Sequence, residues 1–321
     1  MEIDVSQLQA EFGAYYKEGN ANMTNLISQI YETTQTDELF KYYPTKSTVY
    51  ESSFVDVGTL LQSYQHEFTE TGADMRFVPR KTELARIKMD ISIIPDEVVG
   101  EWAGFLADEG LDPSKYPLVA YALENHFLPK WKEDWENDAV YGGVFTAPTP
   151  GTANASNQVV DGIRKQINDS ALIGGADNVQ VIVTGAPSLD PETWVNQVEA
   201  FVQGIPTKFR KKIPYLNMNI TLRDRFRKGM RAKYNMNYDQ TSIDRVIDTN
   251  IMVKGLDSMT GSDKIWCSTP DNMRRPEKRS GNKNRVRMQL DRRKLLLMTD
   301  YFKAVAFKYM GFVWANDRDT V

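Results

Sequence analysis

Two strand-like flanks around a turn constrain the fold of this chain more strongly than any other feature of its sequence. Residues 49–68 and 75–94 are rich in β-branched and aromatic side chains, and the turn-forming residues 70–74 separate them. Each flank has room for a strand of roughly 15–20 residues, whereas strands in globular proteins usually have about 5–6. A hairpin of this length extends beyond its own domain, so the sequence predicts that a second surface covers it.

An uninterrupted apolar stripe predicts one long helix over residues 116–140. Apolar side chains recur at every fourth position: Val119, Leu123, Phe127, Trp131, Trp135 and Ala139. A helix of this length extends about 36 Å. Because a repeat of four exceeds the ~3.6 residues of a helical turn, we expect the stripe to drift around the helix and to contact more than one partner element. Pro129 is expected to bend the helix.

The remaining sequence divides into segments of different character. Residues 1–47 offer only short apolar stripes, which predicts an extended arm that folds on a neighbouring molecule. Residues 152–235 alternate helical and strand patterns, with a helix that opens at Asp190-Pro191 and a strand over 215–222, and are typical of a compact α/β unit. From residue 240 onward the pattern is β-rich.

The residues that support most catalytic and metal chemistry are scarce. The chain has one cysteine, Cys267, and two histidines, His66 and His126, without a helical metal-ligand spacing. Phosphate-binding, dinucleotide-binding, serine-nucleophile and zinc-protease motifs are missing. The N-terminus lacks a signal-peptide pattern, and no apolar run reaches the ~18 residues of a membrane span. We therefore expect no enzyme activity, no cofactor, no metal site and no membrane partner, in a protein made in a cytoplasm.

The net charge of -4 conceals a strong division along the chain. Residues 1–200 carry 13 Lys and Arg against 31 Asp and Glu, whereas residues 201–321 carry 26 against 12. The basic residues cluster within residues 208–287, which is compatible with nucleic-acid binding. No nucleic-acid recognition module accompanies these clusters, and the chain as a whole is acidic. The division therefore favours contact between the basic half of one copy and the acidic half of the next.

The order of these features resembles the major capsid proteins of tailed phages with the Hong Kong 97-type shell fold, over nearly the whole chain. Three stretches are similar to capsid sequences of phages infecting Bacteroidetes: IPDEVVGEWAGFLAD, KWKEDWENDAVYGG and KIWCSTPDNMRRPEKRSGNKNRVRMQLDRRKLLLMTDY. The resemblance implies an α+β fold whose parts follow in order: an N-terminal arm (1–47), an extended hairpin loop (48–94), a peripheral domain with a long spine helix (95–150), an axial α/β domain (151–239), and an axial-to-peripheral return that completes the peripheral sheet (240–321).

The resemblance also implies a structural function. Such a protein self-assembles, as hexamers and pentamers, into an icosahedral shell around double-stranded phage DNA. Scaffolding and portal proteins are the expected partners, the host bacterial cytoplasm is the expected place of assembly, and the virion capsid is the final location. Encapsulin nanocompartments share the fold and remain an alternative. A nucleic-acid-binding or processing enzyme that uses the basic region 208–287 is a second alternative.

Charged residues supply the candidate contacts between subunits. We expect four basic residues on the distal half of the hairpin to pair with an acidic surface of a neighbouring subunit: Arg76, Arg80, Lys81 and Arg86. Four acidic residues on the long helix are the expected partners: Glu133, Asp134, Glu136 and Asp138. These carboxylates spread around the helix, which favours a solvated or subunit-facing surface over a metal or acid–base site.

Overall fold

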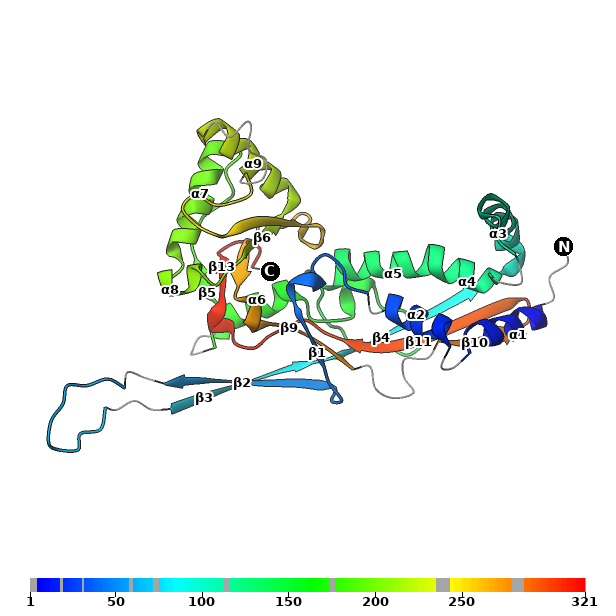
Figure 1. Ribbon diagram of the computed structural model, residues 1–321, viewed down its shortest axis with the longest axis horizontal. Helices are drawn as coiled ribbons and strands as arrows, with labels where there is room; N and C mark the ends of the chain where they lie inside the picture. The colour runs from blue at the N-terminus through cyan, green and yellow to red at the C-terminus, as the bar shows by residue number, and fades with distance from the viewer. Residues whose placement is uncertain are drawn as a thin grey trace.

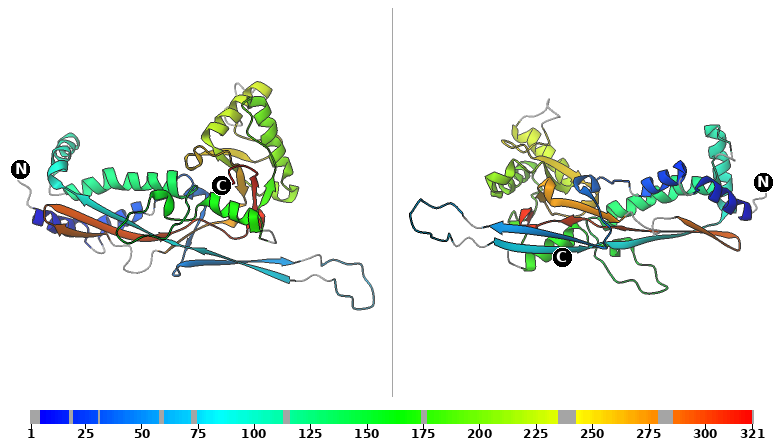
Figure 2. Two further views of the ribbon diagram at one scale, coloured as in Figure 1. Left: turned by 180° about the vertical axis from the view of Figure 1, so that it is seen from behind. Right: turned by 60° about the horizontal axis from the view of Figure 1, so that its bottom comes forward.

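The computed structural model describes residues 5–17, 20–30, 32–57, 60–71, 75–112, 116–173, 177–234, 243–278 and 286–320. Within these residues the chain is elongated and has two parts, each built on a sheet, together with a projecting hairpin (Figure 1, Figure 2). The long part combines a six-stranded sheet with the long helix, and the second part packs helices on a five-stranded sheet. This mixture of helix and sheet agrees with the α+β class expected from the sequence.

The six-stranded sheet lies in the long part and shares one hydrophobic core with the long helix. Its strands are β1 (Lys41–Pro44), β9 (Met273–Lys278), β11 (Lys294–Lys303), β10 (Arg287–Asp291), β12 (Ala306–Phe307) and β4 (Ala85–Ile93). The longest pairing joins β4 to β11 in antiparallel register, from Ala85 opposite Lys303 to Ile93 opposite Leu295. Alternate side chains along β11, including Leu295 and Leu297, are buried, because one face of the sheet packs against the core.

The predicted long helix is present as a continuous run of helical turns over residues 118–139. Its four segments are α4 (Leu118–Ala122), η2 (Leu123–Phe127), α5 (Leu128–Asp134) and η3 (Trp135–Ala139). The segments η2 and η3 are π-helical, so their backbone bonds span five residues, as between the Val140 amide and the Trp135 carbonyl. Pro129 is the second residue of α5, in the first turn after the first π segment.

The apolar stripe contacts more than one partner element, as its four-residue spacing predicts. The segment α4 packs against α1 (Val5–Tyr15) and α3 (Pro95–Glu109), α5 packs against α2 (Ala21–Ile30), and η3 packs against the short helix η5 (Asp257–Met259). All six stripe residues belong to or pack against one core cluster, and Trp131 lies 5.2 Å from the Tyr301 ring on β11.

Helix α3 (Pro95–Glu109) leads from β4 towards the long helix and stands away from the body at one end of the molecule (Figure 1). Pro95 occupies its first position, and Gly110 ends it with a φ of 62°, a conformation that favours glycine. Trp102 and Leu106 anchor the helix in the core. The helix thus begins at a proline and ends at a glycine, the residue types typical of these two positions.

The N-terminal segment differs from the extended arm expected from its sequence. It forms helices α1 (Val5–Tyr15) and α2 (Ala21–Ile30), and both pack on the core of their own chain. Tyr16 donates a hydrogen bond to Glu124 of the long helix at 2.9 Å. Burial, and to a smaller extent the negative charge of Glu124, raises the pKa of Tyr16. Two short helices can remain folded here because the long helix buries the apolar side that each exposes on its own.

A buried network of charged side chains centres on Asp37, in the short helix η1 (Asp37–Leu39). The Lys303 ammonium on β11 forms an ion pair with the Asp37 carboxylate, and Trp135 Nε1 donates to the same carboxylate at 3.1 Å. Arg275 on β9 lies 3.8 Å from Asp37, and its Nε lies 2.8 Å from Glu277 Oε1. Two carboxylates therefore balance two cations between the long helix and the sheet.

The second part is a five-stranded sheet covered by helices. Its strands in spatial order are β5 (Gln180–Ile182), β13 (Val313–Asn316), β8 (Trp266–Ser268), β6 (Tyr215–Asn219) and β7 (Met252–Leu256). Its helices are α7 (Pro191–Gly204), α8 (Thr207–Arg210) and α9 (Ile220–Tyr234). Helix α6 (Ile163–Ile173) precedes them, and its buried Ile163 and Ile167 belong to the core cluster that contains the long helix. The Asp190 carboxylate caps α7 by accepting from the Thr193 amide at 2.9 Å, which confirms the predicted start.

Two expectations for this region need correction. The strand predicted over 215–222 ends at Asn219, and Leu222 lies in helix α9, because an i, i+2 run of apolar residues continues equally well into a buried helical turn. The β-rich residues after 240 contribute to both sheets, since β7, β8 and β13 complete the five-stranded sheet while β9 to β12 belong to the six-stranded one.

A polar cluster ties the C-terminal segment to the end of the long helix. The Asp319 carboxylate accepts from the Tyr141 hydroxyl at 3.2 Å and pairs with Arg164 on α6 at 3.2 Å. Next to it, Lys264 is 1% exposed and donates to Asn168 Oδ1 at 2.8 Å. Burial lowers the pKa of Lys264 to about 8, although the negative charge of Asp319 opposes the shift. The chain therefore holds this ammonium in a position where its charge is costly.

The substitution Asp37→Ala is expected to lower the free energy of unfolding by about 3–5 kcal/mol, because it leaves the Lys303 and Arg275 charges buried without their carboxylate. Denaturant titration followed by circular dichroism measures this loss. Glu38→Ala is the matched control, since the Glu38 side chain is 62% exposed and lies 3.9 Å from Lys254. A loss below about 1 kcal/mol for Asp37→Ala would contradict the role assigned to the network.

Lys264 is expected to make stability depend on alkaline pH. Between pH about 8 and the usual lysine pKa of about 10.4, the unfolded chain holds the Lys264 proton and the folded chain does not, so stability rises with pH across this window. Thermal melting at pH 7 to 10 should show a smaller rise for Lys264→Met, and a higher melting temperature at pH 7. The exposed Lys294 provides a control, because Lys294→Met should leave the pH dependence unchanged.

Candidate subunit interface

The projecting hairpin consists of β2 (Val49–Val57) and β3 (Met75–Glu83), which form a separate two-stranded sheet. Nine cross-strand pairs run from Val49 opposite Glu83 to Val57 opposite Met75. Both strands are shorter than the 15–20 residues expected, since residues 60–71 form no strand and residues 85–93 continue as β4 in the six-stranded sheet. The hairpin nevertheless extends well beyond the body of the molecule in every view (Figure 1, Figure 2).

One face of the hairpin is anchored to the chain's own body at its base. The Phe54 ring stacks on Tyr309 with centroids 4.1 Å apart, and it contacts the edge of Phe312 at 5.1 Å. On the same face, the Ser52 hydroxyl donates to the Lys308 carbonyl at 3.1 Å. These contacts orient the base of the hairpin before any second molecule is present.

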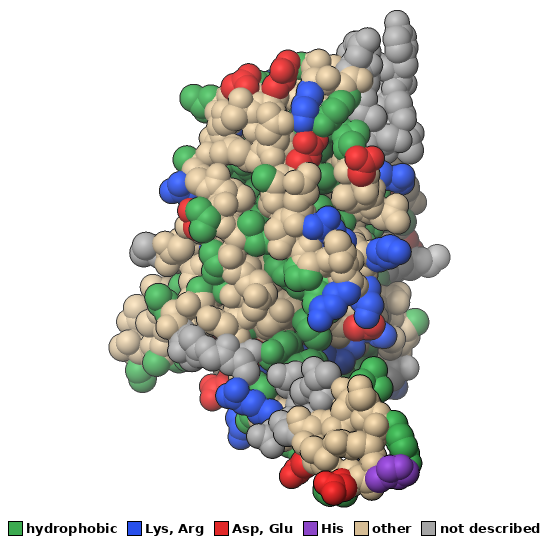
Figure 3. Space-filling view, turned by 90° about the vertical axis from the view of Figure 1, so that its left-hand side faces the viewer, with side chains coloured by type: hydrophobic (Ala, Val, Ile, Leu, Met, Phe, Trp, Pro, Cys, Tyr) green, Lys and Arg blue, Asp and Glu red, His purple; other side chains and the backbone are tan. Residues whose placement is uncertain are grey.

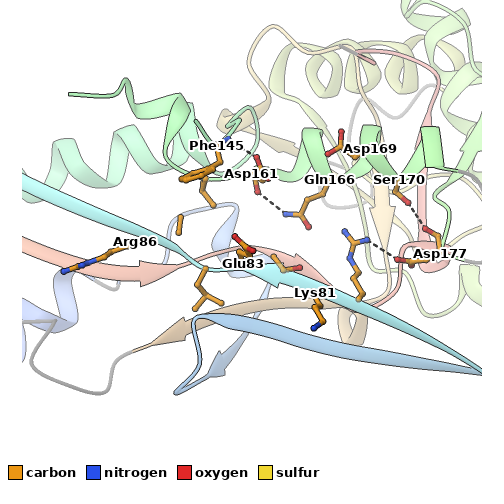
Figure 4. Close-up of a pocket in the computed structure, with 14 residues that line it drawn as sticks. Lys81, Glu83, Arg86, Phe145, Asp161, Gln166, Asp169, Ser170 and Asp177 are labelled. Carbon is orange, nitrogen blue, oxygen red and sulfur yellow. Dashed lines mark hydrogen bonds and ion pairs between the residues drawn. The ribbon is translucent and has the colours of Figure 1, made fainter. Parts of the chain in front are cut away.

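Arg80 adds an ionic anchor on this face. It is the cross-strand partner of Ser52, and its guanidinium lies 3.1 Å from the Asp177 carboxylate. The second Asp177 oxygen accepts from the Met310 amide at 2.6 Å, and the Ser170 hydroxyl donates to the Asp177 carbonyl (Figure 4). A cavity of about 470 Å³ lies beside this junction, between the start of β4 and helix α6. Arg80 therefore has a partner within its own subunit.

The opposite face of the hairpin exposes four apolar side chains in two adjacent cross-strand pairs. Val55 lies opposite Phe77, and Val57 lies opposite Met75. These side chains are 38%, 62%, 40% and 61% exposed, respectively. Because side chains alternate along a strand, this apolar face points away from the side that carries Phe54. The subunit thus presents a hydrophobic strip that the described residues of its own chain leave exposed.

The tip of the hairpin is also unusually apolar for an exposed loop. Leu61, Tyr64 and Phe68 are 93%, 85% and 95% exposed, and Leu60 is 64% exposed. Figure 3 views the molecule from this end, and apolar and acidic side chains lie together on the lobe at the bottom of the view. Together with the strip on the strands, these side chains form a surface of the kind that marks a protein–protein contact.

The remaining predicted basic contacts differ in their surroundings. Lys81 pairs across the hairpin with Glu51 at 3.0 Å, and both side chains are more than half exposed. Arg76 is exposed on β3 and has no ion pair to another described residue. Arg86 requires a correction: it lies on β4 rather than on the distal hairpin, and it pairs with Asp300 of β11 at 2.7 Å. The register of β4 with β11, which sequence pattern does not reveal, decides this position.

Two of the predicted acidic residues lie at the surface of the long helix. Lys130 lies 3.2 Å from both Glu133 and Asp134, at the i+3 and i+4 spacings of a helical surface. The side chains of Glu133 and Asp134 are 56% and 42% exposed. Exposed pairs of this kind contribute little to stability, so both carboxylates remain accessible to a second molecule.

The other two acidic residues are engaged within the subunit. Glu136 is 8% exposed and accepts hydrogen bonds from the amide and the hydroxyl of Thr36, at 3.1 Å and 2.5 Å. Asp138 accepts a hydrogen bond from the Ser156 hydroxyl. The structure therefore separates the four helical carboxylates into two surface groups and two internal acceptors. Their sequence spacing alone could not distinguish these environments, because it does not say which elements cover the helix.

The basic clusters of residues 208–287 divide in the same way. Arg227 forms a bidentate pair with Asp244, and Lys233 lies 2.8 Å from Glu199. Seven further cations are exposed and have no ion pair to a described residue: Lys208, Lys211, Lys212, Lys228, Arg231, Arg245 and Arg287. The cluster members Arg279, Lys283 and Arg285 lie outside the described residues. Five of the seven exposed cations lie on α8, directly after it, or on α9, whereas Arg287 lies on β10 and Arg245 on neither helix.

Sites for other chemistry are not evident in the described part of the chain. No group of three or more His, Cys, Asp and Glu side chains is arranged there to hold a metal ion. Cys267 is buried, and burial raises the pKa of its thiol, which opposes thiolate formation. None of the described helices has the length and apolar character that a membrane crossing needs.

Comparisons with known proteins relate this architecture to viral shells. No protein-family model matches the chain, and no curated protein matches it in sequence. A chain of the satellite phage P4 procapsid superposes with a TM-score of 0.56 at 10% identity, covering 98% of this chain and 97% of that one.

Two further structures are similar over most of their length. The capsid of an empty GTA particle matches with a TM-score of 0.51 at 11% identity, over 90% of this chain and 97% of that one. The cyanophage A-1(L) capsid matches with a TM-score of 0.51 at 12% identity, over 87% and 90%. At these identities the likeness concerns the fold, and the fold is that of phage capsid proteins of the Hong Kong 97-like type.

Proposed function

We propose that this chain is a major capsid protein that assembles into an icosahedral shell around double-stranded phage DNA. The observation that carries this proposal is the hairpin, whose base is anchored to its own subunit while one face and the tip expose apolar side chains. A surface of this kind requires a partner, and a second copy of the chain is the partner that a shell-forming fold supplies.

In this proposal the segments have the roles implied by the capsid resemblance. Residues 48–94 are the extended loop that covers an adjacent subunit, residues 95–150 and 151–239 are the peripheral and axial domains, and residues 240–321 complete both. Residues 1–47 are the arm, which folds here on its own subunit. Hexamers and pentamers form because a heterologous contact that closes on itself generates rings. Several modest interfaces then accumulate enough burial to hold the shell.

The charged contacts between subunits remain part of the proposal in a narrower form. Arg76 and Lys81 on the hairpin are the accessible cations, and Glu133 and Asp134 on the long helix are the accessible carboxylates. Arg80, Arg86, Glu136 and Asp138 would have to leave partners within their own subunit to take part. We therefore assign the intersubunit pairing to the first four residues.

Packaged DNA, scaffolding protein and portal protein are proposed partners. The exposed cations of α8 and α9 are the residues best suited to contact phosphates, since they have no ion pair to a described residue. Assembly in the cytoplasm of a bacterial host, and a host among the Bacteroidetes, are supported by the sequence stretches that are similar to such capsid proteins.

Electron microscopy of the purified chain, alone and co-expressed with candidate scaffolding protein, tests the proposed function. Shells, tubes, or hexameric and pentameric plates are expected, and complete virions should hold nuclease-resistant DNA. Shells that enclose protein cargo without a genome would instead identify an encapsulin-like compartment. Particles of subunit size that bind DNA with steep salt dependence would favour a nucleic-acid enzyme and overturn the proposal.

The double substitution Met75→Ser and Phe77→Ser is expected to weaken assembly without unfolding the subunit. Both side chains are more than 60% exposed in the isolated chain, so the melting temperature of unassembled protein should remain unchanged. Covering them in a neighbour contributes about 1 kcal/mol or more each, so the concentration needed for assembly should rise at least about tenfold. Light scattering measures this concentration.

The double substitution Met75→Leu and Phe77→Leu is the matched control, because it keeps apolar side chains at both positions and should assemble nearly as the natural chain does. Equal assembly of the serine variant and the leucine variant would show that this face of the hairpin remains uncovered in the shell.

A further inference from the structure

Three cations gather on the face of the six-stranded sheet that lies opposite the Asp37 network. Arg275 and Glu277 on β9 point towards that network, so Arg274, which precedes Arg275 in the strand, points to the other face. Lys41 on β1 is the direct cross-strand neighbour of Arg274 in the parallel pair. On the other side of β9, Ala306 lies opposite Arg274, and Lys308 follows two residues later on the same face.

This cation cluster, Lys41, Arg274 and Lys308, has no balancing carboxylate within the described residues comparable to those of the Asp37 network. Arg274 is 9% exposed, and its Nη1 donates to the Met273 carbonyl at 3.1 Å, but it forms no ion pair with a described residue. Burial, and then the charges of Arg274 and Lys41, lower the pKa of Lys308, while Asp271 opposes the shift. An excess of positive charge at a nearly buried position is costly unless an anion joins it.

The cluster lies under the base of the hairpin. Tyr50 of β2 is 5% exposed, and its burial raises the pKa of its hydroxyl. The nearby guanidinium charge of Arg274 opposes this shift, which places Tyr50 close to the cluster. The Ser52 hydroxyl bonds to the Lys308 carbonyl. Nine paired residues separate this base from the tip, a distance of about 30 Å along the strands. The tip of the same subunit therefore points away from its own cation cluster.

The hairpin tip carries the complementary charge. Glu67 and Glu70 are exposed, and neither forms an ion pair with a described residue. They flank Phe68, whose side chain is 95% exposed, so the tip combines anionic groups with an apolar group that needs covering. The exposed ring of Tyr43, two residues from Lys41 on the same face of β1, offers an apolar surface beside the cations.

We propose that the cation cluster is a carboxylate-binding site for Glu67 and Glu70 at the hairpin tip of a second copy of this chain. Arg274 presents a planar donor fork that suits a carboxylate, and the two lysines add charge without a geometric requirement. Each subunit then receives the tip of one neighbour at the base of its own hairpin, a head-to-tail contact that closes into a ring. The inference rests on the proposed function, because it needs a second copy at this distance.

The variants Arg274→Gln and Lys308→Gln test the site through two measurements with opposite expected signs. The unassembled subunit should keep or gain thermal stability, because each change relieves repulsion among like charges. Assembly should weaken, so that the concentration required for shells or plates rises at least tenfold. Lys294→Gln is the matched control, since Lys294 is an exposed cation on β11 of the same sheet. Lys41→Gln is a second variant, because the exposed Lys41 can change without disturbing the core.

A charge exchange tests the identity of the partner. Glu67→Lys with Glu70→Lys should block assembly, and mixing this protein with subunits carrying Lys41→Glu and Lys308→Glu should restore co-assembly of the two. Normal assembly of the cluster variants, normal assembly of the tip variant, or failure of the mixture would overturn the inference. Cluster variants that assemble normally but lose bound DNA would overturn it in favour of a phosphate site.

The same measurements separate the inference from the proposed function. If the natural chain forms no shells or plates, the proposed function fails. If the natural chain assembles and the cluster variants assemble equally well, only the assignment of this site fails. A fall of several degrees in the melting temperature of Arg274→Gln, Lys308→Gln and Lys41→Gln would show that the cluster serves its own subunit's stability, which also overturns the inference.

Discussion

The ion network around Asp37 is the interaction on which the arrangement of the long part depends. It places a carboxylate from the N-terminal segment between a cation of β11 and a cation of β9, under the indole of Trp135. Buried charges require their partners, so the sheet, the long helix and the N-terminal segment adopt one relative position. That position also decides which side chains of β9 face outward, and hence that Arg274 lies beneath the base of the hairpin.

The hairpin shows how a subunit can be stable alone and still incomplete. Phe54, Ser52 and Arg80 attach one face of its base to the body, so its direction is set within the subunit. The strip around Phe77 and the loop around Phe68 have no such cover. The apolar side chains on the free face and the tip of the hairpin therefore still need to be buried. The cation cluster under its base still needs a balancing anion. In the proposed shell, a repeated contact between identical subunits would satisfy all of these positions together.

Much of the local structure follows from the sequence, and the failures share one cause. The long helix, its apolar stripe, the cap at Asp190 and the end of α3 depend on residues close in the chain. The predictions of a strand through Leu222 and of a hairpin position for Arg86 were wrong because packing and strand register override local pattern. The acidic residues of the long helix looked equivalent, yet Thr36, a hundred residues away, makes Glu136 an internal acceptor.

Residue order is sufficient to predict the long helix and the projecting hairpin, and to show that the chain divides its charge between an acidic and a basic half. Periodicity, proline and glycine positions and charge counts are local properties, so they can be read from residue order. Only the folded structure shows which charged side chains form ion pairs within the subunit and which remain exposed to a neighbouring molecule. Ion pairs such as Arg80 with Asp177 join residues far apart in the chain, and their partners are chosen by packing geometry rather than by sequence proximity.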